Sequence, residues 1–258
     1  ASGGIDITSG NAIKIGAGGA ATVVTAQNDL SLAAADDIVL KTATSGLSSA
    51  GGHLVLRGGT GGTGTVDAEV GTTLSSFLDT TISGQGAAAG TMSVSGLTSN
   101  GSVGISQDND IDIVGTGISA VNDISVASAA GVTVDGDVDS SGGEIFLESD
   151  SDNDGVGDLD LTLTTGALTA GTVRLTSNAG EVDIDNDPNN TAGGITFGPS
   201  IGIKLGADLT ATGPIDASVV TNGITLDAAS TITSNGGDIT LGGAIVGVQA
   251  LILDAGAA

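Results

Sequence analysis

The residues best suited to chemistry in this sequence form an acidic run from Asp150 to Asp158. Carboxylates stand at positions 1, 3, 5 and 9 of the run, and a glycine stands at position 6. This order is typical of a calcium loop, in which hard oxygen ligands surround the ion from a tight turn. The expected ligands are Asp150, Asp152, Asp154, Val156 and Asp158, with Val156 at the position that binds through its backbone carbonyl.

This run resembles the Asp-rich calcium loops of thrombospondin type 3 repeats and dockerins. It departs from them at position 12, where Leu161 replaces an acidic ligand. Asp160 lies one place early, and Glu148 could substitute only by folding back. The alternative interpretation is a solvated acidic loop between a strand ending at Leu147 and a strand starting at Leu159. Ca²⁺ is the cofactor that the first interpretation predicts.

Other candidates for chemistry are weaker. Asp183, Asp185 and Asp187 form a second acidic cluster, for which a solvated surface is the favoured interpretation. The acidic pair Asp36–Asp37 is expected to mark a turn, and the single histidine, His53, to point outward from a strand. Pectate lyases and polygalacturonases, which are right-handed β-helices, combine acidic pairs with Arg, Lys or His. The chain also has no Cys nucleophile and no Trp or Tyr for stacking on sugars, so we do not expect an enzyme.

The charge balance restricts the partners. Asp and Glu number 30 against 5 Lys and Arg, which gives a formal net charge of -25. Nucleic-acid binding needs a basic patch, and the few cations here are scattered along the chain. No apolar run is long enough to span a bilayer, so we expect no membrane insertion. The charge suits divalent cations, or it simply keeps a sheet-rich surface soluble through self-repulsion.

The elements that must carry these residues are short strands. Apolar residues alternate with polar ones in segments such as Ile111–Ile113, Val132–Val134 and Leu159–Leu163. With 45 Gly, 3 Phe, 1 Met and no Trp, the interior must be narrow and filled by Ile, Leu, Val and Ala. Stacked thin coils have such an interior. An antiparallel sandwich is the alternative.

A Gly-Gly corner followed by a strand recurs along the chain. The corners begin at positions 3, 51, 101, 142, 193 and 236, the third being Gly-Ser, and their spacing fits two coils of about 20–25 residues each. We expect glycine there because a tight corner needs positive φ. The sequence therefore predicts an all-β, right-handed parallel β-helix of roughly 10–12 irregular coils. It forms a single domain over 1–258, with irregular or loop insertions near 57–91 and 150–158.

The corner-and-strand pattern, as in Asn235-Gly-Gly-Asp-Ile-Thr-Leu241, resembles the repeat regions of filamentous-haemagglutinin-like bacterial exoproteins. The resemblance implies a right-handed parallel β-helix, secretion, and a surface or adhesive role. The Asn-Pro-rich secretion motifs of that family are not in this sequence, so the export route stays open.

The two ends of the sequence read as continuous. The segment that closes at Ala258 leads almost in register into the segment that opens at Ala1, and neither has an obvious polar cap. We expect each end to stack on copies of the chain or on further repeats of the same polypeptide.

Our first hypothesis is thus an extracellular structural rod. The alternatives are an adhesin that binds a glycan or surface ligand through side loops, and a polysaccharide-active enzyme. Ice binding is disfavoured because no Thr-x-Thr ladder keeps its period.

Overall fold

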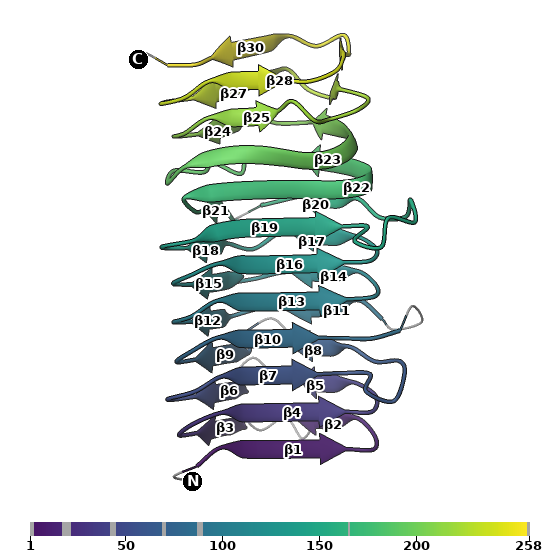
Figure 1. The fold of residues 1–258 in the computed structure, drawn as a ribbon, viewed down its shortest axis with the longest axis vertical. Helices are drawn as coiled ribbons and strands as arrows, with labels where there is room; N and C mark the ends of the chain where they lie inside the picture. Colours follow the sequence, from purple (N-terminus) through teal and green to yellow (C-terminus); the bar gives the residue numbers. More distant parts are fainter. Residues whose placement is uncertain are drawn as a thin grey trace.

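The computed structural model describes residues 3–16, 22–41, 45–68, 71–86, 90–164 and 166–256. Every regular element in these ranges is a β-strand, and no helix there is long and apolar enough to cross a membrane. The strands stack in parallel as a β-solenoid of about 10 turns, which confirms the predicted fold class. In Figure 1 the near strands run to the right while the chain climbs, and the far strands return to the left, so the winding is right-handed.

Most turns contribute one strand to each of three faces, but the turn that spans residues 172–193 has no strand on the third face. Face 1 contains β1 (Ile5–Ser9), β4 (Leu30–Ala34), β7 (Leu54–Arg57), β10 (Thr80–Ser83), β13 (Val103–Gln107), β16 (Ile124–Ser128), β19 (Glu144–Ser149), β25 (Ile215–Ala217) and β28 (Ile239–Leu241). Face 2 contains β2 (Ile13–Ile15), β5 (Ile38–Leu40), β8 (Val66–Ala68), β11 (Met92–Val94), β14 (Ile111–Ile113), β17 (Val132–Val134), β20 (Leu159–Leu161), β26 (Ile224–Leu226) and β29 (Ile245–Val246).

Face 3 closes the other turns. It contains β3 (Val23–Ala26), β6 (Gly46–Ser49), β9 (Thr73–Ser76), β12 (Leu97–Ser99), β15 (Ile118–Ala120), β18 (Val138–Ser140), β21 (Leu168–Thr169), β24 (Leu209–Ala211), β27 (Ser230–Ser234) and β30 (Leu251–Asp254). The two long strands β22 (Thr172–Ile184) and β23 (Gly194–Leu205) run across the corner and belong to both face 1 and face 2.

Parallel register stacks like residues on like. Ile111, Val132 and Leu159 lie directly above one another on face 2, and all are fully buried. Because side chains alternate along a strand, the intervening positions point to solvent. The predicted narrow apolar interior is confirmed: Phe197 is buried in it, whereas Phe146 lies under the Arg174 guanidinium with 4.9 Å between charge and ring centre.

The Gly-Gly corners overturn one expectation. Among the described residues, neither Gly51–Gly52 nor Gly142–Gly143 has a positive φ, so the predicted reason for glycine is wrong at these corners. The cause is close approach of the preceding turn. A Cβ at Gly143 would overlap the carboxylate of Asp123. A corner of another kind, Asn222–Gly223 before β26, does have the positive φ, 88° at Gly223.

The two expected insertions differ in kind. Within 57–91 the chain forms β8, β9 and β10, and the irregular part there is the segment 58–65, where Gly64 bridges to Gln85. Residues 69–70 and 87–89 lie outside the described residues, as do Ala1 and Ala258. The segment 150–158 is a loop that projects from the stack between β19 and β20 (Figure 1).

Candidate functional site

The acidic loop 150–158 leaves the stack at a buried corner. The N–H of Asp150 donates to the carbonyl of Ala130 in the turn below, at 2.9 Å, so the start of the loop is tied to the solenoid. Asp150 and Asn153 take left-handed φ angles of 51° and 58°, and Gly155 takes 88°. Short polar residues and glycine tolerate this conformation, which explains how the sequence forms so tight a loop.

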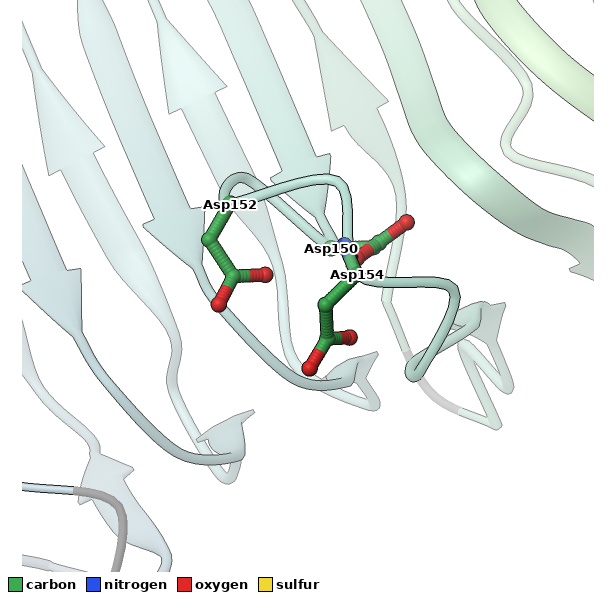
Figure 2. Close-up of side chains that lie close together, drawn as sticks. All are labelled: Asp150, Asp152 and Asp154. Atoms are coloured by element: carbon green, nitrogen blue, oxygen red, sulfur yellow. The ribbon is translucent and has the colours of Figure 1, made fainter.

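The loop brings three of its predicted ligands together. One carboxylate oxygen from each of Asp150, Asp152 and Asp154 lies within 4.8 Å of the others (Figure 2). Asp150 is fully buried, while Asp152 and Asp154 are exposed. The Asp150 Oδ1 accepts the N–H groups of Asp154 at 2.9 Å and Gly155 at 3.2 Å. Its Oδ2 is buried and has no hydrogen-bond partner among the described residues.

The other two predicted ligands are placed differently. The Asp158 carboxylate accepts the N–H of Glu181 in the next turn, at 2.8 Å, and does not belong to the group of three. Val156 is 62% exposed, and its N–H donates to the Asp154 carboxylate at 2.9 Å. Glu148 accepts the side-chain amide of Asn178 at 2.9 Å and is not a member of the group either. The described loop therefore gathers positions 1, 3 and 5 of the predicted calcium loop, and not position 9.

An acidic groove that sequence reasoning missed lies beside this loop. It has a volume of about 300 Å³, and Val156 forms part of its wall. Four carboxylates line it, those of Asp110, Asp112, Asp158 and Asp160. Nothing in the sequence marks these four residues as a group. Asp110 and Asp158 stand at corners, whereas Asp112 and Asp160 are the outward residues of the strands Ile-Asp-Ile and Leu-Asp-Leu. Only the register of β14, β17 and β20, which aligns Asp112 with Thr133 and Asp160, brings them together.

The groove disfavours the ionised form of its own carboxylates. Burial raises the pKa of Asp160, and the neighbouring carboxylates of Asp183 and Asp158 raise it further. Burial likewise raises the pKa of Asp112, with a smaller contribution from Asp110. Carboxylates held together in this way favour protons or cations, because either one relieves their mutual repulsion.

The weaker cluster of Asp183, Asp185 and Asp187 does not converge. Asp183 points outward from β22 and lies 3.5 Å from the Lys204 ammonium, which also pairs with Glu181 at 3.0 Å. The hydrogen bond to Glu181 raises the pKa of Lys204. Asp187 instead accepts the N–H of Thr210 at 2.8 Å at the corner before face 3.

The candidate catalytic residues lie apart. Asp36 and Asp37 border a groove of about 380 Å³ together with Lys14, a neighbour that the sequence did not indicate. Asp37 is committed to the backbone, because its carboxylate accepts the N–H of Thr65 at 3.0 Å. His53 stands before β7 at a different corner, where its half-exposed ring lies 3.6 Å from the Asp79 carboxylate.

Most of the aspartates at the corners between strands have a structural role. At these corners one Asp residue links three turns: its carbonyl accepts an N–H from the turn below, and its carboxylate accepts an N–H from the turn above. We call these residues the corner aspartates: Asp29, Asp37, Asp79, Asp110, Asp123, Asp137 and Asp158. Charged acceptors make stronger hydrogen bonds than neutral ones, so aspartate suits this position.

The chemistry that this arrangement offers is cation binding by carboxylate oxygens, at the loop and in the groove. Comparison of the chain with family models, with curated proteins and with solved structures found no match in any of the three. The resemblance to filamentous-haemagglutinin-like exoproteins therefore stays a prediction beyond the shared solenoid architecture.

Proposed function

We propose that this chain is an extracellular structural module, a β-solenoid rod that stacks end to end in a filament, a sheath or a giant cell-surface protein. The observation that carries the proposal is that apolar side chains in inward-pointing positions are exposed at the two outermost described turns. Ile7 is 40% exposed at one end, and Ile245 and Leu253 are 45% and 52% exposed at the other. Their equivalents in the middle of the stack, such as Ile105 and Ile203, are buried.

A further turn would bury these side chains and pair the open strand edges. Unpaired edges are templates for another strand, and stacked repeats are stable only where a neighbour covers each apolar face. The same pattern of corner, strand and buried column supports a relationship to filamentous-haemagglutinin-like exoproteins. On that relationship the rod would be secreted by a bacterium and displayed at its surface.

Electron microscopy of the purified chain tests this proposal. Long polymers with the solenoid axis along the fibre are the expected result. Discrete particles that bind glycans or cells would contradict it and favour an adhesin acting through the loops at 58–65 and 150–158.

We also propose that the acidic loop binds Ca²⁺ through Asp150, Asp152 and Asp154. Support comes from the convergence of three carboxylates on one loop and from the buried, unpaired Oδ2 of Asp150. A buried carboxylate oxygen without a partner is costly, and a nearby cation offsets that cost. The backbone bonds to Asp150 Oδ1 hold its carboxylate in place before an ion arrives.

The melting temperature with calcium and with chelator tests the loop. Calcium should raise the melting temperature of the wild-type chain, and Asp152→Ala together with Asp154→Ala should abolish the increase. Asp112→Asn is the control for the neighbouring groove, since it removes one negative charge there and leaves the loop intact. A melting temperature that chelator does not change, or an increase that only Asp112→Asn removes, contradicts calcium binding by the loop.

A further inference from the structure

We infer that successive copies of this chain join head to tail, and that the carboxylate of Asp238 in one copy accepts the backbone N–H of Gly4 in the next. The inference rests on the proposed end-to-end stacking and specifies its partner, polarity and contact residues. It starts from a two-part corner that the solenoid uses repeatedly between its own turns.

In this two-part corner, a corner aspartate sits before the face 1 strand of one turn, and a glycine and a donor residue sit before the face 1 strand of the next. Asp123 accepts the N–H of Glu144 at 2.9 Å, and the residue before the donor is Gly143. A side chain at that glycine would overlap the aspartate carboxylate. The other examples are Asp29 with Gly52 and His53, and Asp79 with Gly101 and Ser102.

Among the described residues, Asp238 is the first half of such a corner and no residue supplies the second half. It precedes β28 as Asp123 precedes β16, and its carbonyl accepts the N–H of Ile215 from the turn below at 2.9 Å. The same carbonyl bond, from Val103, anchors Asp123. The Asp238 side chain is exposed, and within the described ranges no residue donates a hydrogen bond to its carboxylate.

Gly3 and Gly4 are the second half of a corner, and no residue that the structure describes supplies the first half. Ile5 pairs with Leu30 and stands in the same column as Ile145, so Gly4 occupies the place of Glu144 and Gly3 the place of Gly143. Whereas a Cβ at Gly143 would overlap a carboxylate, no atom of the described residues lies within 4 Å of a Cβ built at Gly3. The space that a corner aspartate fills elsewhere is open here.

The apolar columns agree with this alignment. Placing Gly4 over Asp238 sets Ile5 and Ile7 over Ile239 and Leu241, which continues both inward columns of face 1. The contact joins two different surfaces, so each added copy presents a new end and the assembly grows as an open polar filament. A net charge of -25 on each copy opposes association, so added salt should strengthen it.

Sedimentation velocity of the 258-residue chain, over a range of concentrations in high salt, tests the junction. Asp238→Ala removes the acceptor, and Gly3→Ala fills the space for it. Each should raise the concentration needed for assembly about tenfold or more, the effect of losing one hydrogen bond to a charged group. Asp254→Ala is the matched control: it removes one charge from the same outer turn, where Asp254 accepts only the N–H of Gly256 in its own loop among the bonds described, and it should assemble as wild type.

Mixing the two variants provides the sharpest readout. Each keeps one intact end, so the Gly3 end of the Asp238→Ala chain should bind the Asp238 end of the Gly3→Ala chain. At a concentration where each variant alone is monomeric, the mixture should contain pairs and no longer polymers. Unfolding curves of the monomeric variants should match wild type, because among the described residues nothing donates to the Asp238 carboxylate and no atom lies within 4 Å of a Cβ at Gly3.

The contrary outcomes are distinct. If both variants polymerise as readily as wild type, the Asp238–Gly4 junction is wrong and the proposed rod stands. If wild type forms closed pairs only, head-to-tail polarity is wrong. If wild type stays monomeric at every concentration and salt, the proposed end-to-end stacking fails, and the junction fails with it.

Discussion

The carboxylate of Asp123 accepts the backbone N–H of Glu144, one turn further along the solenoid, at 2.9 Å. The carbonyl of the same Asp123 accepts the N–H of Val103 from the turn before, also at 2.9 Å. One residue thus links three consecutive turns, and the other corner aspartates repeat the arrangement. Some of the aspartates that appear in the sequence only as negative charge therefore connect successive turns of the solenoid.

Replacing Asp123 with alanine should destabilise the fold. The substitution leaves the Glu144 N–H without its protein acceptor, and we expect a loss of about 1 kcal/mol, kept modest because water reaches this exposed corner. Asp139→Ala, which removes an equal charge from the outward position of β18, is the control. Urea unfolding of both variants measures the difference, and equal stability of the two would show that the corner bond contributes nothing.

Replacing Gly143 with alanine should destabilise the fold as well, for a different reason. The new Cβ would overlap the Asp123 carboxylate and the adjacent backbone, so the turn must shift, at a cost of about 1–3 kcal/mol. Gly104→Ala is the control because no atom lies within 4 Å of its Cβ position on the outer side of β13. Thermal unfolding of the two variants decides the matter: a Gly143→Ala chain as stable as Gly104→Ala would refute the close-approach explanation.

Replacing Asp160 with asparagine should stabilise the fold at neutral pH. Burial, and then the carboxylates of Asp183 and Asp158, raise the folded-state pKa of Asp160 above the usual 3.8. The folded chain therefore holds this proton more tightly than the unfolded chain, and ionised Asp160 destabilises the fold above the raised pKa. The destabilisation disappears as the pH falls through the raised pKa towards 3.8. The advantage of Asp160→Asn should shrink over the same window.

Asp135→Asn should show the opposite sign. A hydrogen bond from the Thr164 hydroxyl lowers the pKa of Asp135, so its ionised form stabilises the fold at neutral pH, and this stabilisation is lost as the pH falls below 3.8. Melting temperatures of wild type and both variants between pH 3 and pH 7 measure the two effects. If Asp160→Asn lowered the melting temperature at pH 7, the described repulsion in the groove would be wrong.

The architecture was predictable because it follows from local patterns. Alternation in segments such as Ile111–Ile113 gives the strands, and the spacing of the Gly-Gly corners gives the turns. The reason for the glycines was not predictable, since the carboxylate that requires Gly143 belongs to Asp123, about twenty residues earlier. The groove was missed for the same reason: Asp112 and Asp160 become neighbours only through the register of β14, β17 and β20. The loop at Asp150 was found because its residues are contiguous, whereas the commitment of Asp158 to Glu181 depends on the next turn.

The axial repeat of the assembled chain tests the central claim most directly. About 10 turns at the ordinary strand spacing of about 4.8 Å give a repeat on the order of 50 Å per copy, if the last turn of one copy stacks directly on the first turn of the next. Electron microscopy of polymers of the purified chain should show this repeat along the fibre, with strands perpendicular to the axis. A chain that stays monomeric, or a fibre whose repeat does not match the length of one solenoid, would contradict end-to-end growth.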